Sequence, residues 1–173
     1  MKDFLTLCVS RFETLEDELN ALDAATGDGD HGSTILKGLR AAASSDDPPL
    51  KAFRKAAGGA SGSLFAQIIA ALDRASKTTP LPDALSEAVT KISMLGQAKA
   101  GDKTMLDALI PAAAETTFQA AADAAAKGRD ATRDMIAKRG RAKHVEGAGV
   151  GHIDAGATSV AELLALFAEW RSR

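Results

Sequence analysis

The sequence predicts an all-α protein, on three observations about its composition and periodicity. Alanine, the residue with the highest helix propensity, is very abundant and lets helices approach closely. Sheet-forming residues never cluster into alternating runs, and the aromatic residues are six Phe, one Trp and no Tyr. Apolar residues recur instead at three- and four-residue steps, which places them on one face of a helix.

The composition is that of one soluble domain covering residues 1–173. The hydrophobic fraction of 46% and the charged fraction of 25% are ordinary, and the net charge of −2 makes nucleic acid an unexpected partner. No apolar run reaches the ~20 residues that span a bilayer, and the first residues lack the features of a signal peptide, so no membrane partner is expected. The single cysteine, Cys8, excludes an intrachain disulfide and suits the reducing cytoplasm, where we expect the protein to reside.

In the first half of the chain, breaks rich in glycine, proline and short polar residues separate the expected helices. These helices cover residues 3–22, 33–43, 49–57 and 63–76. A glycine-punctuated loop, 23–32, follows the first helix, and a breaker cluster, 44–49, follows the second. The glycines of 58–62 interrupt the helical pattern between the third and the fourth.

In the second half, the expected helices cover residues 82–95, 102–128, 130–138 and 157–170. Within the long helix, Asp102 is expected to cap the start, Pro111 to kink the middle and Gly128 to end it. The stretch 139–156 is irregular and rich in glycine. Loops of that length are usually functional or disordered.

The loop 23–34 carries the most informative chemical pattern. Asp23, Asp28 and Asp30 lie within eight positions, and such carboxylates repel each other unless a hard cation such as Mg²⁺ or Ca²⁺ lies between them. The intervening glycines allow a tight turn and a close approach to a ligand. The loop leads into a helix start at Ser33, where main-chain N–H groups favour a phosphate. The pattern therefore predicts a metal–phosphate site.

An EF-hand calcium loop and a solvated acidic turn are two alternatives to this interpretation. An EF-hand calcium loop shares the opening Asp28, Asp30 and Gly32, but its later ligands and its closing Glu are missing. A solvated acidic turn would account for a lone Asp-Gly-Asp. The additional Asp23 and His31, with the helix start that follows, favour the metal–phosphate site.

Two further segments rich in small residues are weaker signals. The main-chain amides of 58–63 and the Ser61 hydroxyl are suited to phosphate oxygens, although close helix packing or a kink explains the same residues equally well. The segment lacks the Gly-Lys-Ser/Thr ending of a Walker loop. Residues 101–105 are explained by Asp102 as a helix cap and Met105 as a core residue.

A basic segment, 139–144, precedes a second glycine-containing stretch, 151–157. Its basic side chains are suited to neutralising phosphate charge, and by themselves they describe a solvated surface equally well. Asp154 is expected either to cap the last helix or to act on a bound nucleotide.

Together these segments resemble the nucleotide-binding L subunit of dihydroxyacetone (glycerone) kinases and the equivalent domain of single-chain ATP-dependent kinases. The matching stretches, in the family's order, are LDAATGDGDHGST, GGASGSLF, GDKTMLDALIPA and KRGRAKHVEGAGVGHIDAGATS. The Asp-x4-Asp-Gly-Asp-His-Gly motif is highly specific, and the four matches span 22–159. The resemblance implies a closed barrel of about eight antiparallel amphipathic helices with a nucleotide site at one end.

The resemblance also implies ADP or ATP, bound with two Mg²⁺ ions that Asp23, Asp28 and Asp30 hold. The residues implied to contact the nucleotide are His31, Gly32, Ser33, Thr34, Ala60 and Ser61 at the phosphates, Gly96, Thr104 and Met105 at the adenine and ribose, and Arg141, Asp154, Ala155 and Gly156. No residue is assigned as a general base. Ala155 stands where the family usually has proline, and this difference frees one backbone angle of that loop.

The implied activity is phosphoryl transfer to dihydroxyacetone, which in the family is bound by a separate K subunit or domain. That domain is absent from these 173 residues, so the chain is expected to act with a K subunit as its partner. A phosphohistidine protein of the phosphotransferase system would recharge bound ADP. An ATP-dependent route, a related tetrose or ketose substrate, and a regulatory module that binds a transcription regulator stay open, as do a purely structural bundle and the oligomeric state, including a homodimer.

Overall fold

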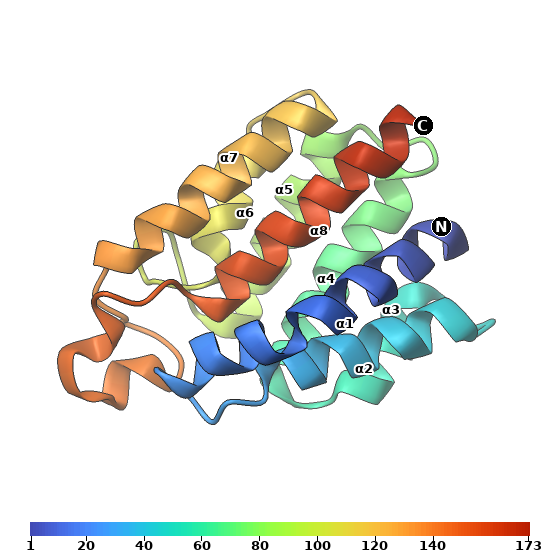
Figure 1. The fold of residues 1–173 in the computed structure, drawn as a ribbon. Coiled ribbons are helices and arrows are strands. Elements are labelled where there is room, and N and C mark those ends of the chain that lie inside the picture. Colours follow the sequence, from blue (N-terminus) through green and yellow to red (C-terminus); the bar gives the residue numbers. More distant parts are fainter.

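The computed structural model describes residues 1–173 and is entirely helical, without any strand (Figure 1). Its α-helices are α1 (Lys2–Ala24), α2 (His31–Ser44), α3 (Pro49–Ala57), α4 (Gly59–Ala75), α5 (Leu81–Gly96), α6 (Met105–Ala113), α7 (Phe118–Ala131) and α8 (Ala155–Ser172). Three short 3-10 turns lie between α7 and α8, at Thr132–Asp134, Ala142–His144 and Glu146–Gly149. The predicted all-α class and the expected number of helices are confirmed. No helix combines the length and the apolar character that a membrane crossing requires.

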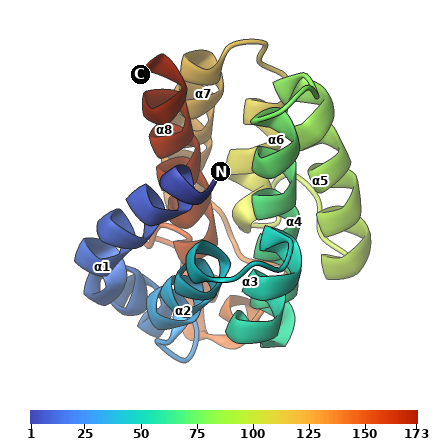
Figure 2. The same cartoon turned by 90° about the vertical axis from the view of Figure 1, so that its right-hand side faces the viewer.

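The helices form a ring in which each one packs against the next in sequence. α8 packs against α1 as well as α7 and α6, so the last helix meets the first (Figures 1 and 2). One continuous hydrophobic core of 40 buried residues fills the ring. Phe167 of α8 makes edge-to-face contacts with Phe4 of α1 at 5.2 Å and with Phe118 of α7 at 5.5 Å between ring centroids. Such pairs contribute about 0.5–1.5 kcal/mol beyond burial, and these join three helices of the ring.

The first four helices follow the predicted order, with two changes at helix starts. α2 begins at His31 rather than at Ser33, so His31 and Gly32 belong to the helix and not to the loop. α4 begins at Gly59 rather than at residue 63, so only Gly58 lies between α3 and α4, and Gly59 is the first residue of α4. Both have positive φ angles, of 67° and 61°, which glycine adopts readily. Ala60 and Ser61 consequently lie in the first turn of α4 instead of in a loop.

The prediction of one long helix over 102–128 was wrong. The structure has two helices, α6 and α7, and the break lies after Ala113 rather than at Pro111, which α6 accommodates. Thr117 starts the second helix, because its side chain accepts a hydrogen bond from the Ala120 amide at 3.2 Å. The boundary between the two helices is thus marked by a threonine cap within an alanine-rich sequence, and no glycine or proline marks it.

Asp102 and Gly128 also differ from their predicted roles. Asp102 is buried before the helix, and Thr104 caps α6 instead. Gly128 lies inside α7 because the helix passes very close to α6: an added Cβ would lie 2.2 Å from the Asp107 carbonyl oxygen. Glycine here serves helix packing and not helix termination.

The short helix predicted over 130–138 was wrong as well. α7 extends to Ala131, and only the 3-10 turn Thr132–Asp134 follows. The irregular chain beyond it is nevertheless bonded to itself, since the Ala137 amide donates to the Ala148 carbonyl and the Gly151 amide donates to the Arg133 carbonyl. The segment 135–154 is therefore a folded connection between α7 and α8.

Candidate functional site

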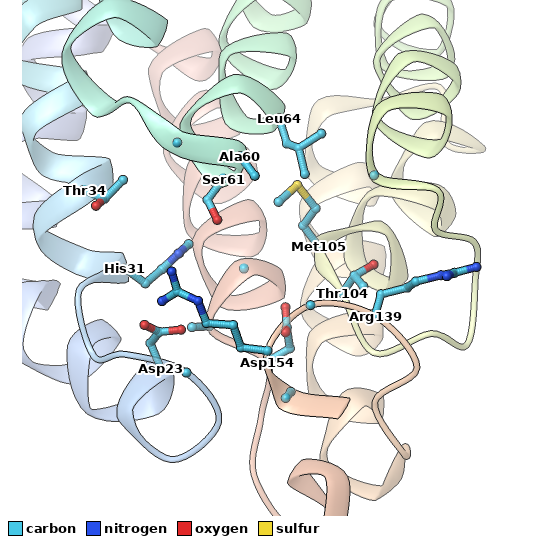
Figure 3. Close-up of a pocket in the computed structure, with 18 of the residues that line it drawn as sticks. Asp23, His31, Thr34, Ala60, Ser61, Leu64, Thr104, Met105, Arg139 and Asp154 are labelled. Atoms are coloured by element: carbon cyan, nitrogen blue, oxygen red, sulfur yellow. The ribbon is translucent and has the colours of Figure 1, made fainter. Parts of the chain in front are cut away.

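A cavity of about 630 Å³ opens at one end of the ring (Figure 3). It is lined by the first turns of α2, α4, α6 and α8, by the ends of α1, α3 and α5, and by residues 139–142. Because consecutive helices reverse direction, the four even-numbered helices begin at this end. A helix start carries unpaired main-chain N–H groups and a positive partial charge, so the cavity is suited to an anion.

The cavity collects nearly all the residues that the sequence pointed to. Those that line it are Asp23, Asp28, Asp30, His31, Thr34, Ala60, Ser61, Gly96, Thr104, Met105, Arg141, Asp154, Ala155 and Gly156. Gly32 and Ser33 do not line it. Gly32 faces the Glu16 carbonyl of α1, which an added Cβ would approach to 2.3 Å. The Ser33 hydroxyl donates to Glu16 Oε1 at 2.7 Å, so these two residues join α2 to α1.

The acidic loop brings its three carboxylates together at the rim of the cavity. Oxygens of Asp23, Asp28 and Asp30 lie within 4.8 Å of one another. The Asp23 carboxylate is fixed by the loop itself, because its Oδ2 accepts from the Gly29 amide at 2.9 Å and from the Asp30 amide at 3.1 Å. Gly29 has a φ of 76°, which a tight turn of this kind requires. An all-oxygen donor set of this size fits a hard cation such as Mg²⁺.

The basic segment meets the acidic loop through one ion pair. The Arg141 guanidinium contacts the Asp28 carboxylate, and its hydrogen bond is the main cause that lowers the pKa of that carboxyl. Both side chains are exposed, so this pair contributes little to stability. Its consequence is geometric: residues more than a hundred positions apart share one rim of the cavity.

The first turns of α2 and α4 lack side-chain caps. Asp30 precedes α2 and is a residue type that usually caps helices, yet its carboxylate makes no cap hydrogen bond and lies with Asp23 and Asp28 instead. Gly58 precedes α4 and has no side chain to offer. Ala60 and Ser61 follow in the exposed first turn (Figure 3). At the start of α2 the Ser33 amide donates to Asn20 Oδ1 at 3.2 Å. The other main-chain amides of the two first turns have no side-chain cap and are suited to oxygen atoms of a ligand.

His31 holds α2 in place from beneath the cavity. Its Nε2 lies 2.9 Å from the Ser159 hydroxyl of α8, and its ring packs edge-on against Phe65. Burial lowers the pKa of His31 to about 4, so the imidazole is neutral at pH 7. The side chain thus serves packing, and only the main chain of His31 belongs to the helix start.

The first turns of α6 and α8 are capped. Thr104 accepts from the Leu106 amide at 3.2 Å, and Asp107 accepts from the Thr104 amide at 2.8 Å, which completes a capping box. Asp154 accepts from the Ala157 amide at 2.7 Å. Burial raises the pKa of Asp154 to about 6, and the Ala157 hydrogen bond partly offsets this. Ala155 takes the first helical position, where proline would also fit.

Comparison with known families identifies the family to which the chain belongs. The chain matches the family model described as the DAK2 domain over residues 49–169. This chain belongs to the DAK2 domain family. The resemblance to the L subunit of dihydroxyacetone kinases, drawn from the motifs, is confirmed by the relatives that follow.

The relatives of this DAK2 domain are kinases and kinase subunits. D-erythrulose kinase of Mycolicibacterium smegmatis is 36% identical over 84% of this chain and 31% of that protein. The ADP-binding subunit DhaL of the PEP-dependent dihydroxyacetone kinase of Escherichia coli is 28% identical over 96% of this chain and 93% of the subunit. The corresponding subunit of dihydroxyacetone kinase 2 of Listeria innocua is 32% identical over 85% of this chain and 82% of the subunit. The chain thus spans about a third of the erythrulose kinase and nearly the whole of the Escherichia coli subunit.

A solved structure shares the fold. The dihydroxyacetone kinase of C. freundii, in complex with AMP-PNP and Mg²⁺, superposes with a TM-score of 0.77 and 28% identity. The match covers 98% of this chain and 33% of that chain. The likeness therefore extends over the acidic loop, which lies outside the residues matched by the family model.

Of the apolar wall of the cavity in this DAK2 domain, the sequence analysis named only Met105 and missed Leu64 and Leu95. Leu64 and Met105 extend into the cavity from α4 and α6 (Figure 3), and Leu95 lines it from the end of α5 although its side chain is 63% exposed. An exposed leucine beside Gly96, at a predicted helix end, was the available signal. Such a wall is suited to a flat apolar group such as a base.

Lys103 was also missed. It lines the cavity, is 2% exposed, and burial lowers its pKa while the neighbouring carboxylates of Asp154 and Asp134 oppose that shift. The segment around it suggested a helix cap followed by a core residue, and no local pattern distinguishes a buried lysine from an exposed one. Only the folded chain reveals its partners.

Proposed function

We propose that this DAK2 domain binds ADP or ATP with magnesium. In this proposal it passes a phosphoryl group to dihydroxyacetone, or to a related ketose, held by a separate K subunit. The observation that carries the proposal is the cavity itself, which joins three clustered carboxylates to the uncapped first turns of α2 and α4. Cation ligands and free amides at one end of a cavity suit a metal-bound phosphate chain.

At the phosphate end, Asp23, Asp28 and Asp30 would hold two Mg²⁺ ions. Magnesium, when bound there, supplies neutralisation of the phosphate charge. The amides of the first turn of α4, beside Ser61, would bind phosphate oxygens, and Arg141 lies close enough to the acidic loop to add positive charge. The Asp23 carboxylate is held by loop amides before any ligand arrives, so this part of the site is preorganised.

At the other end, the apolar wall would receive the adenine. Leu64, Leu95 and Met105 provide apolar surface, and the cavity volume of about 630 Å³ lies in the range of small-molecule sites. Thr104 and Asp154 also line the cavity and have polar side chains. They are suited to the ribose and its neighbouring phosphate.

Phosphoryl transfer of this kind depends on positioning and charge neutralisation more than on covalent help from the protein. No residue of this chain is assigned as a general base, because the acceptor hydroxyl would be held by the K subunit. The Escherichia coli relative, named as a PEP-dependent enzyme's ADP-binding subunit, supports a route in which a phosphohistidine protein of the phosphotransferase system recharges bound ADP. The erythrulose kinase relatives favour a second candidate, an ATP-dependent kinase of a four-carbon ketose.

Native mass spectrometry of the purified chain, with analysis of the released nucleotide, tests the proposal first. Retained ADP with two Mg²⁺ ions would support the coenzyme route, and reversible binding of Mg-ATP the ATP-dependent one. Titration calorimetry of Asp28→Asn is expected to show at least a tenfold loss of Mg-ADP affinity. Asp17→Asn, an exposed acid of α1 that does not line the cavity, is the matched control.

Failure to bind any adenine nucleotide at millimolar Mg²⁺ would overturn the proposal. If Asp28→Asn bound Mg-ADP like the native protein and only gained thermal stability, the carboxylate cluster would be a solvated acidic turn. The chain would then be a structural helical bundle.

A further inference from the structure

The lysine of the turn before α6 has a role that nucleotide binding alone does not explain. Lys103 is 2% exposed, whereas every other lysine of the chain is exposed. Its φ of 60° lies in the left-handed region that residues with side chains rarely adopt. Burying an ammonium group is costly unless it is hydrogen-bonded. A buried lysine on a strained backbone therefore indicates specific partners.

Those partners lie at the two ends of the connection between α7 and α8. Lys103 Nζ donates to the Thr132 carbonyl and to the His152 carbonyl, each at 2.5 Å. The lysine stem also packs beneath Gly149, where an added Cβ would lie 3.1 Å from Cε. Thr132 and His152 lie near the two ends of residues 132–154, which join α7 to α8, so one side chain ties both ends of this connection to the turn before α6.

Asp102 reinforces the attachment from the neighbouring position. It is 2% exposed, and its carbonyl accepts from the Lys138 amide at 3.1 Å. Its carboxylate lies 3.6 Å from Arg139 Nε. Asp102 therefore holds the middle of the connection while Lys103 holds its ends.

The connection in turn carries several lining residues of the cavity, among them Arg141 and Asp154. The Asp154 amide donates to the Thr132 hydroxyl at 3.0 Å, and His152 is two positions before Asp154. Arg141, which contacts Asp28 across the rim, lies in the same connection. Any shift of the Lys103 ammonium would therefore reach Asp154, the first turn of α8 and Arg141.

We propose that Lys103 is a positioning residue that sets the α8 side of the cavity by clamping both ends of the α7–α8 connection. The ligand in this inference is the Mg-ADP of the proposed function, on which the inference rests. Lys103 acts through main-chain carbonyls and does not need to touch the nucleotide. Its loss would loosen residues 133–154 and leave helices α1 to α5 intact.

Hydrogen exchange of the nucleotide-free protein and calorimetric titration with Mg-ADP test the clamp. Lys103→Met keeps the stem but removes the donors, and it is expected to speed exchange in 133–154 at least tenfold and to weaken Mg-ADP binding at least tenfold. Lys103→Arg, which can still donate to both carbonyls, is expected to restore part of the exchange protection and part of the Mg-ADP affinity. Lys99→Met, in the same turn but exposed, is expected to behave as the native protein.

Native exchange rates and native Mg-ADP affinity in Lys103→Met would overturn the clamp. The clamp would also be overturned if Lys103→Arg showed exchange rates and an Mg-ADP affinity no closer to the native values than those of Lys103→Met. If Lys103→Met failed to fold, Gly149→Ala would decide, because its added Cβ would press on the lysine stem and on Thr26 Cγ2. That variant is expected to loosen the same segment, and unchanged exchange in it would reject the clamp. If the native protein bound no Mg-ADP, the proposed function would fail, while the exchange measurement would still test Lys103.

Discussion

The four helix starts at the cavity form two pairs that differ in how their first amides are satisfied. α6 and α8 are capped by the side chains of Thr104 and Asp154, whereas the residues before α2 and α4 provide no cap, and only the Ser33 amide of α2 is bonded to a side chain, that of Asn20. An uncapped start at a cavity wall leaves donors and positive partial charge for a ligand, but a capped start is already complete. The difference divides the cavity into an anion-binding side at α2 and α4 and a structural side at α6 and α8.

A negative charge placed in the first turn of α4, which contains no acidic residue, should disturb this division most strongly. Ser61→Asp places a carboxylate in the first turn, where the helix dipole favours it by about 0.3–1 kcal/mol. The same carboxylate would repel phosphates, and like charges placed together cost several kcal/mol, so Mg-ADP affinity should fall at least ~100-fold. Calorimetric titration and thermal melting measure the two effects in one sample. Ser86→Asp, exposed on α5 and outside the cavity, is the control, and equal affinities of the two variants would contradict the assignment.

On the capped side, Asp154→Asn should change stability in a pH-dependent way. The native pKa of about 6 exceeds the ordinary value of 3.8, so the native state holds this proton longer than the unfolded state. The resulting stability is present below pH 4 and is lost as pH rises through 6. Asparagine cannot ionise and still caps a helix, so the variant should gain about 1–3 kcal/mol at pH 7.5 and nothing at pH 4. Denaturant unfolding at both pH values measures this, and a gain of the same size at both would contradict it.

The smallest effect is expected from removing the cap of α6. Thr104→Ala should lower the free energy of unfolding by about 1 kcal/mol, and Tm by about 2–4 °C for a chain of this size. Mg-ADP affinity should change far less than in Ser61→Asp, because the cap hydrogen bond lies within the protein. Should Thr104→Ala lose affinity as severely as Ser61→Asp, the capped starts would belong to the anion-binding side too.

Much of the fold was predictable because its determinants are local. Apolar spacing and glycine or proline breaks predicted the positions of α1 to α5 and α8. The residue types in the loop that carries Asp23, Asp28 and Asp30 were enough to predict that its carboxylates cluster. The errors fell where a determinant was distant or weak in sequence. Thr117 separated α6 from α7 by a cap within an alanine-rich run, and Gly128 was kept as glycine by the backbone of another helix.

The candidate site shows the same limit. Motif matching named residues near the cavity, but it could not distinguish Ser33, which faces Glu16 of α1, from Thr34, which lines the cavity one position later. Lys103 gave no local signal, because its partners Thr132 and His152 lie about thirty and fifty positions away. Orientation within a helix turn and long-range main-chain contacts are properties of the packed chain.

The positions of the two chain ends set a minimum length for any tether to a second domain. Met1 precedes α1 and Arg173 follows α8, and both ends lie away from the cavity end of the ring (Figure 1). α8 has 18 residues and starts at the cavity, so at ~1.5 Å per residue its far end is about 27 Å away. A linker that returned along this length would need at least ~8 fully extended residues. A second domain joined after Arg173 would therefore bring its first residues to the cavity mouth only through a linker of at least this length.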